Sequence, residues 1–246
     1  MPLLKPAIAV IGKKKTGKTT VVEKLVKKLV SEGFNVSTLK HTIETFDIDY
    51  VGTDSYRHRQ AGAVFVALQG RLRSAIIVEK EISFEKLLEY ASLFGDVIVL
   101  EGFSKLTLRD PRIGKIICVK DEAEKEEYRE AVNVLCYSVN GALDIEKVVL
   151  WLKEQVKVFN IYRKTPMIDC KLCGYGSCYE FSKAVAGNLE YIEKCPMMNV
   201  RVYVDGKGIP LTRYPASIIR NVTMAMLSTL KGVGSLEGKM VKIYVE

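Results

Sequence analysis

Apolar and polar residues alternate along the first part of the chain in short runs that predict strands followed by helices. A first strand is expected at Ala7–Ile11, and apolar residues at helical spacing predict an amphipathic helix over Thr20–Ser31, ended by Gly33. Further strands are expected at Val36–Leu39, Val64–Leu68, Ala75–Val78, Val97–Leu100, Ile116–Val119 and Val134–Val139, with helices at Asp54–Ala61, Phe84–Leu93 and Asp144–Val158. This alternation predicts an α/β fold with a mostly parallel sheet covered by helices, and ligands at the carboxyl ends of its strands.

The pattern changes after residue 158, where a second and smaller domain is expected. Its expected elements are a helix at Tyr179–Tyr191, a strand pair at Val200–Val204 and Ile209–Leu211, a helix at Ala216–Leu230 and a last strand at Met240–Val245. The sequence therefore predicts two domains, residues 1–158 and 159–246, the second of them α+β.

Composition narrows the class of protein. The chain has 246 residues, 48% of them hydrophobic, but no apolar stretch long enough to span a membrane. Its start lacks the layout of a signal peptide, so we expect a cytoplasmic protein whose six cysteines are metal ligands or buried thiols rather than disulfides. A net charge of +8 admits nucleic acid, acidic membranes or anionic small molecules as partners.

A phosphate-binding loop stands between the first strand and the first helix. Its residues, together with the threonine that follows, are Gly12, Lys13, Lys14, Lys15, Thr16, Gly17, Lys18, Thr19 and Thr20. The glycines let the backbone curl so that successive N–H groups face an anion at a helix N-terminus. Lys18 is expected to reach the outer phosphates and Thr19 to ligate magnesium, as in a P-loop NTPase.

Two further segments carry candidate residues at strand ends. Glu101 ends an apolar strand and is the candidate catalytic group, orienting the attacking water or a magnesium-bound water. Lys40 and His41 end another strand and are candidate nucleotide contacts. The loop after them carries further magnesium candidates, Asp47, Asp49 and Asp54. His58 falls in a helical stretch and reads as structural.

Four cysteines in the second domain form a three-plus-one set. They are Cys170, Cys173, Cys178 and Cys195. Three thiolates on a glycine-containing loop and a remote fourth suit a [4Fe-4S] cluster, whereas zinc sites more often pair two C-x-x-C knuckles. Zinc and metal-free thiols stay open as alternatives. Cys118 and Cys136 lie in strand patterns and are expected to be buried structural thiols.

In their order and spacing, these motifs resemble a known family. The phosphate loop, Lys40-His41, Phe46-Asp47-Ile48-Asp49, Asp54-Ser55-Tyr56, Ala61-Gly62-Ala63 and Glu101-Gly102-Phe103 together resemble the molybdopterin-guanine dinucleotide biosynthesis protein B family. The resemblance covers about residues 5–158. It implies a dimeric, magnesium-dependent GTP-binding protein with weak GTPase activity, which assists the enzyme that attaches GMP to the pterin cofactor. The cysteine spacing separately resembles a small iron–sulfur module of corrinoid iron–sulfur proteins and some membrane redox complexes.

The sequence thus favours a GTP-binding accessory protein of molybdenum or tungsten cofactor biosynthesis that carries an iron–sulfur module. A redox or metallocluster-assembly NTPase is the first alternative. A zinc-stabilised, nucleic-acid-binding NTPase is the second, although no aromatic residues interleaved with basic ones suggest a nucleic-acid surface.

Overall fold

The computed structural model describes residues 3, 5–198, 200–236 and 241. The chain folds as two compact units that divide between Leu152 and Lys153, and each is described by itself. The division falls inside helix α5 (Ile145–Tyr162), and the boundary expected after residue 158 lies further along the same helix. Apart from Val241, the expected last strand Met240–Val245 lies outside the described residues.

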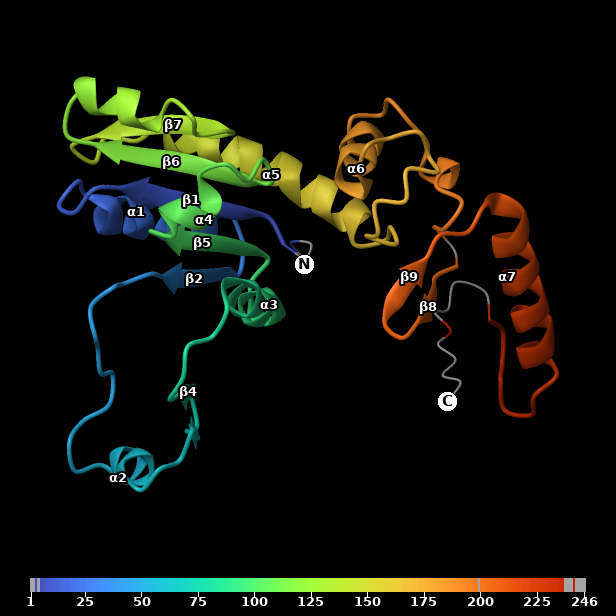
Figure 1. Cartoon of the computed structure of the whole chain (residues 1–246), viewed down its shortest axis with the longest axis horizontal. Helices are drawn as coiled ribbons and strands as arrows, with labels where there is room; N and C mark the ends of the chain where they lie inside the picture. Colours follow the sequence, from blue (N-terminus) through green and yellow to red (C-terminus); the bar gives the residue numbers. More distant parts are fainter. Residues whose placement is uncertain (1–2, 4, 199, 237–240, 242–246) are drawn as a thin grey trace. The chain divides into compact units, whose positions relative to one another are not determined.

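A five-stranded parallel sheet forms the centre of the first unit (Figure 1). Its order is β2-β5-β1-β6-β7, and the strands are β1 (Ala7–Gly12), β2 (Val36–Lys40), β5 (Val97–Glu101), β6 (Ile113–Val119) and β7 (Val134–Val139). The runs of β1 and β5 are almost continuously buried, as expected for parallel strands covered on both faces. The expected α/β architecture is therefore confirmed.

Two helices cover this sheet with faces that their sequences define. Helix α1 (Lys18–Ser31) buries Val21, Leu25 and Leu29, one apolar residue per turn. Helix α3 (Phe84–Phe94) begins at Ser83, whose side chain accepts a hydrogen bond from the N–H of Lys86 and so caps the first turn. A short helix α4 (Ser104–Thr107) and a 3₁₀ segment η1 (Ala123–Tyr128) complete the connections.

Two expected strands do not join the central sheet. Strands β3 (Phe65–Gln69) and β4 (Ser74–Val78) pair antiparallel with each other and form a separate hairpin after helix α2 (Asp54–Gln60). The connection between the strands is too short for a parallel crossover, which requires a dozen or more residues. We call residues 41–79, which include α2 and this hairpin, the arm.

One charged side chain is buried in the central sheet. Lys115 on β6 is fully buried, and its ammonium group donates hydrogen bonds to the carbonyl oxygens of Asp110 and, at 2.7 Å, of Ile113. Burial lowers the pKa of Lys115 from 10.5 to about 8, although the carboxylate of Asp110 opposes this shift. The apolar pattern alone placed the strand start at Ile116 and missed this residue.

The stability of the first unit is expected to depend on Lys115 at alkaline pH. Because the folded pKa is depressed, the unfolded chain binds more protons between about pH 8 and 10.5. The free energy of unfolding should therefore rise with pH through that window, by up to about 3 kcal/mol relative to Lys115→Met. Urea unfolding at both ends of the window measures it. Lys120→Met, at the exposed residue directly after β6, is the control, and an identical pH dependence in wild type and Lys115→Met would refute the assignment.

The second unit contains the cysteine segment and the C-terminal helix. Its elements after α5 are α6 (Cys178–Ala186), the 3₁₀ segment η2 (Ile192–Lys194), the antiparallel pair β8 (Val202–Val204) and β9 (Lys207–Ile209), and α7 (Arg213–Ser228). Helix α6 is shorter than expected because Gly187 ends it and Asn188 adopts a left-handed conformation with φ 57°. Within the described ranges of both units, no helix is long and apolar enough to cross a membrane.

Candidate functional site

The phosphate loop is shaped by two glycines that no other residue can replace without strain. Gly12 has φ 150°, and a Cβ at this position would lie 2.2 Å from the carbonyl oxygen of Cys118 on the neighbouring strand. Gly17 has φ 82° and is the N-cap of α1, where a left-handed backbone starts the helix without a side-chain cap. The loop therefore leaves β1 in close contact with β6 and enters α1 with free N–H groups at its end.

The side chain of Lys18 extends back over the phosphate loop. Lys18 is the first residue of α1, and its ammonium group donates to the carbonyl oxygen of Lys13 at 2.5 Å. The hydroxyl of the buried Thr16 donates to the same oxygen at 2.9 Å. The bond to Lys13 holds the ammonium group of Lys18 over the loop. A cation in this position can neutralise the negative charge of a phosphate chain.

The candidate catalytic carboxylate lies beside the candidate magnesium ligand. The hydroxyl of Thr19 donates to Oε1 of Glu101 at 2.9 Å, and the ammonium group of Lys40 lies 3.3 Å from the same oxygen. Strand pairing brings the three together, because β5 lies between β1 and β2 and all three strands end at the same edge. The structure thus joins three residues predicted separately from three segments.

Other lysines of the loop contact acids that sequence reasoning missed. Lys13 pairs with Glu127 at 2.5 Å and with Glu124 at 3.7 Å, both on η1. Lys14 pairs with Glu44 at 2.9 Å at the start of the arm. In each case the hydrogen bond to the acid raises the pKa of the lysine. The acid-rich run over residues 121–127 was the signal available in the sequence.

The two histidines differ in their surroundings. The backbone N–H of His41 donates to the carbonyl oxygen of Glu101 at 2.9 Å, and its ring lies 5.1 Å from the ring of Phe103. His41 is therefore held at the edge where the site residues gather. His58 lies in α2 of the arm, where its carbonyl oxygen accepts from the N–H of Ala63.

The three magnesium candidates of the arm, Asp47, Asp49 and Asp54, are engaged locally. Arg59 binds Asp47 at 2.8 Å and Glu79 at 2.6 Å, and lies 3.5 Å from Asp49. Asp54 lies 3.8 Å from Arg57 on the same helix. Hydrogen bonds from Arg59 lower the pKa of Asp47. The structure does not bring these acids to the Thr19–Glu101 pair, and their magnesium role stays a prediction.

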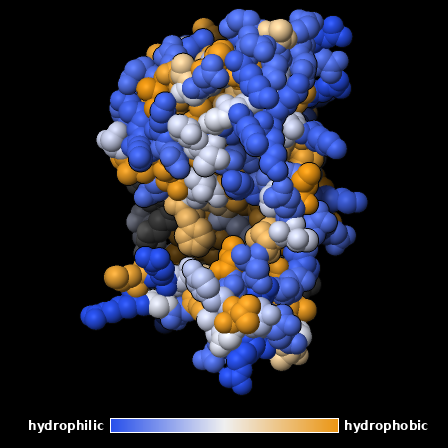
Figure 2. Space-filling view, turned by 90° about the vertical axis from the view of Figure 1, so that its left-hand side faces the viewer, coloured by the Kyte–Doolittle hydropathy of each residue, from blue (hydrophilic) through white to orange (hydrophobic). Residues whose placement is uncertain are grey.

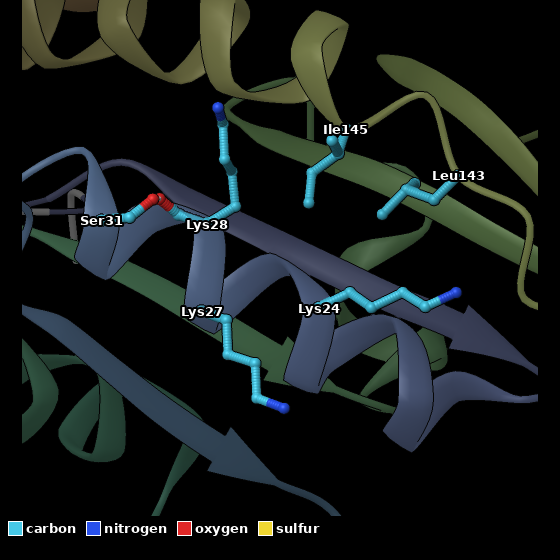
Figure 3. Close-up of a pocket in the computed structure, with 6 residues that line it drawn as sticks. All are labelled: Lys24, Lys27, Lys28, Ser31, Leu143 and Ile145. Atoms are coloured by element: carbon cyan, nitrogen blue, oxygen red, sulfur yellow. The ribbon is translucent and has the colours of Figure 1, made fainter.

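A shallow groove of about 440 Å³ runs beside α1, and Figure 3 shows its lining residues. Lys24 donates to the carbonyl oxygen of Gly141 at 3.0 Å, and Lys28 bridges Glu32 and Glu146 at 3.0 and 2.9 Å. The groove begins about 9 Å along the helix from Lys18. Its lysines fasten the turn after β7 to α1, which sets Gly141 against the phosphate loop at Gly17.

Three of the four cysteines of the second unit share one apolar cluster, and the fourth begins helix α6. Cys173 and Cys195 are buried with Phe181 and Met197, and Cys170 packs against them. Cys178 is buried at the first residue of α6, where Ser177 caps the helix. Repulsion from the thiolates of the other three adds to the burial that raises the pKa of the Cys195 thiol. Cys195 therefore lies within electrostatic reach of the other three cysteines, and all four are free.

Nearby groups partly oppose the effect of burial at two of these cysteines. Burial raises the pKa of the Cys178 thiol, while the backbone of Asp169 and Ile168 and the side chain of Thr165 oppose that rise. The backbone of Met197 does the same for the pKa of Cys195. Four free thiols fit an iron–sulfur cluster in number and in chemistry. Among the described residues, however, no three His, Cys, Asp or Glu side chains are grouped closely enough to hold a metal ion.

The other two cysteines are isolated in the central sheet. Cys118 on β6 is fully buried, and Cys136 on β7 is half-buried. Burial raises the pKa of both thiols to about 11, so neither carries thiolate character near neutral pH.

A glycine-shaped loop at the end of β1, with its lysine and threonine on α1 and a carboxylate on the neighbouring strand, defines the first unit as a P-loop NTPase of the α/β class. The sequence model described as "Molybdopterin guanine dinucleotide synthesis protein B" matches residues 7–137, and the chain belongs to this family. A second model, described as "Putative Fe-S cluster", matches residues 166–197, which include all four cysteines.

Relatives with curated names agree with this family. A Methanocaldococcus jannaschii protein named "Putative molybdopterin-guanine dinucleotide biosynthesis adapter protein" is 30% identical over 97% of both chains. The Molybdopterin-guanine dinucleotide biosynthesis adapter protein of Haemophilus influenzae is 30% identical over 59% of this chain and 80% of its own length. The Escherichia coli protein of the same name is 33% identical over 48% of this chain and 67% of its own.

Solved structures of the family were also matched. The crystal structure of Bacillus subtilis MobB gives a TM-score of 0.44 at 26% identity, over 54% of this chain and 78% of that one. The MobB homologue from Bacillus stearothermophilus gives 0.43 at 23% identity, over 61% of this chain and 97% of that one.

Proposed function

We propose that this chain is a GTP-binding accessory protein with weak GTPase activity that acts in the cytoplasm in molybdenum or tungsten cofactor biosynthesis. It assists the enzyme that attaches GMP to molybdopterin. Family membership and the names of the relatives support the pathway. One observation carries the nucleotide chemistry. The hydroxyl of Thr19, on the helix that begins with Lys18, lies 2.9 Å from the carboxylate of Glu101 at the end of β5.

Each residue of this site has a role that follows from its chemistry. The N–H groups of residues 13–19 bind the phosphates, and Lys18 neutralises the outer ones. Thr19 and Glu101 are oxygen donors of the kind that magnesium prefers, and the metal would neutralise phosphate charge. Glu101 orients the attacking water, and the ammonium group of Lys40 lies 3.3 Å from its carboxylate. The guanine preference comes from the family resemblance.

Replacing Glu101 by glutamine tests this assignment. Glu101→Gln keeps the size of the side chain and an oxygen that can accept from Thr19, but removes the charge. We expect GTP to bind nearly as well, because the phosphate loop is untouched, while hydrolysis falls about a hundredfold. Titration calorimetry measures the first quantity and phosphate release the second.

Asp96→Asn is the matched control for this variant. Asp96 directly precedes β5, at the end away from Glu101, and contacts Lys5 and Asn35. This substitution also removes one carboxylate and should leave hydrolysis unchanged. Unchanged turnover in Glu101→Gln would demote Glu101 to a structural residue at a strand end.

The arm supports the second part of the proposal, a homodimer. Its exposed apolar residues include Ile43, Phe46, Ile48, Tyr50, Val51 and Leu72, each at least 66% exposed. Figure 2 shows hydrophobic residues among hydrophilic ones on one face of the molecule. A surface this apolar is typical of protein contacts, and a second copy of the chain is the partner that the family implies. A light-scattering mass of a single chain would contradict the dimer.

The four cysteines support the third part, a [4Fe-4S] cluster with zinc as the alternative ligand. The match over residues 166–197 favours iron and sulfide. The match to an iron–sulfur model also keeps a second function open, that of a redox or metallocluster-assembly NTPase. Loss of the cluster to an acceptor protein during hydrolysis would favour that function, whereas turnover accelerated by the pterin-linking enzyme would favour the first.

A further inference from the structure

The loop that carries the first cysteine has an unusual backbone. Met167, Asp169 and Lys171 all have positive φ, at 55°, 47° and 61°, although none is glycine. Residues with side chains rarely adopt this conformation, and it persists only where the surroundings impose it. The conformations alternate along the chain on both sides of Cys170, so the loop curls tightly around that residue.

Asp169 holds Cys178 through a hydrogen bond to its backbone. The backbone N–H of Cys178 donates to Oδ1 of Asp169 at 2.7 Å. This bond fixes the amide of a cysteine nine positions away, and joins the loop of Cys170 to the start of α6.

The charge of Asp169 adds a second effect. Its carboxylate accepts the hydrogen bond from the N–H of Cys178 and belongs to the residue directly before Cys170, so a negative charge lies beside two of the proposed ligands. A negative charge near an iron–sulfur cluster disfavours the added electron, because net charge and hydrogen bonds to the sulfurs set the potential. The carboxylate also occupies the N–H of Cys178, which is then not free to donate to a sulfur.

We propose that Asp169 is a positioning residue of the iron–sulfur site, whose carboxylate orients Cys178 and lowers the reduction potential of the cluster. The inference rests on the proposed [4Fe-4S] cluster and adds a determinant of its redox behaviour. Asp169 acts through the cysteine that it holds. Two substitutions separate its effects, since asparagine keeps a hydrogen-bond acceptor without the charge and alanine removes both.

The experiment uses the full-length chain purified without oxygen. Iron per chain is measured chemically, and the midpoint potential by a redox titration followed by electron paramagnetic resonance. Asp169→Asn should retain wild-type iron and show a higher potential. Asp169→Ala should lower the affinity for the cluster about tenfold, because Cys178 loses its orienting partner. Asp205→Asn, in the turn between β8 and β9, is the charge-matched control and should change neither quantity.

The outcomes distinguish this inference from the proposal on which it rests. Wild-type protein with zinc or no metal would overturn the cluster itself and the role of Asp169 with it. Wild-type protein with iron, but with an unchanged potential in Asp169→Asn, would overturn the role of Asp169 alone. Should Asp169→Ala fail to fold, the potential of Asp169→Asn still decides, because a purely structural role leaves that potential unmoved.

Discussion

Lys18→Ala is expected to weaken GTP binding about a hundredfold while leaving the fold intact. Lys18 is the cation drawn across the phosphate loop, where its ammonium group lies 2.5 Å from the carbonyl oxygen of Lys13. Hydrogen bonds to charged groups contribute about 1.5–3 kcal/mol each, so the loss should weaken binding by about a hundredfold. Calorimetric titration with GTP and magnesium measures the effect, and circular dichroism checks the fold.

A control on the same helix separates the effect of losing a positive charge from the effect of losing a contact in the phosphate loop. Lys27→Ala also removes one positive charge from α1, but Lys27 lines the groove beside the helix rather than the phosphate loop (Figure 3). It should bind GTP as wild type does. Wild-type affinity in Lys18→Ala, or an equal loss in both variants, would refute the assignment of the phosphate loop.

The six cysteines are expected to divide into two groups when each is replaced by alanine. Loss of Cys170, Cys173, Cys178 or Cys195 removes one thiolate of the proposed cluster, and should lower the iron content and the broad visible absorption. Cys118→Ala and Cys136→Ala should keep both, because these thiols lie in the central sheet and their pKa values are raised to about 11. Iron analysis of anaerobic preparations measures the difference. Equal iron in all six variants would place the metal elsewhere.

Much of the nucleotide site could be predicted because its signals are local. The glycines, lysine and threonine of the phosphate loop are contiguous, and strand and helix patterns flank them. The contact of Glu101 with Thr19 is not local, since it depends on β5 lying next to β1 in the sheet. Apolar runs show that strands exist but not which strands are neighbours. The roles of the residues at the strand ends could therefore be predicted from the sequence, but the contacts between them could not.

The errors have the same origin in tertiary structure. The runs at Val64–Leu68 and Ala75–Val78 have the composition of sheet strands, and only their short connection shows that they form a hairpin of their own. Lys115 interrupts an apolar run, yet it is buried because two backbone carbonyls accept its hydrogen bonds. Helix α6 ends at Ala186, earlier than its apolar pattern suggested, because Gly187 and Asn188 follow. In each case a contact or turn overrides the periodicity.

The cysteine spacing predicted the ligand set but not its support. Asp169 was visible only as the residue before Cys170. The structure shows it bound to Cys178, nine positions away, through a bond that no periodicity reports.

The proposed function requires a nucleotide site and an iron–sulfur site on one chain. The metal content of the wild-type protein tests this requirement most directly. The protein is purified without oxygen, and iron, acid-labile sulfide and zinc are counted per chain. About four iron and four sulfide per chain are predicted, with a broad visible absorption. One zinc per chain without iron would contradict the account.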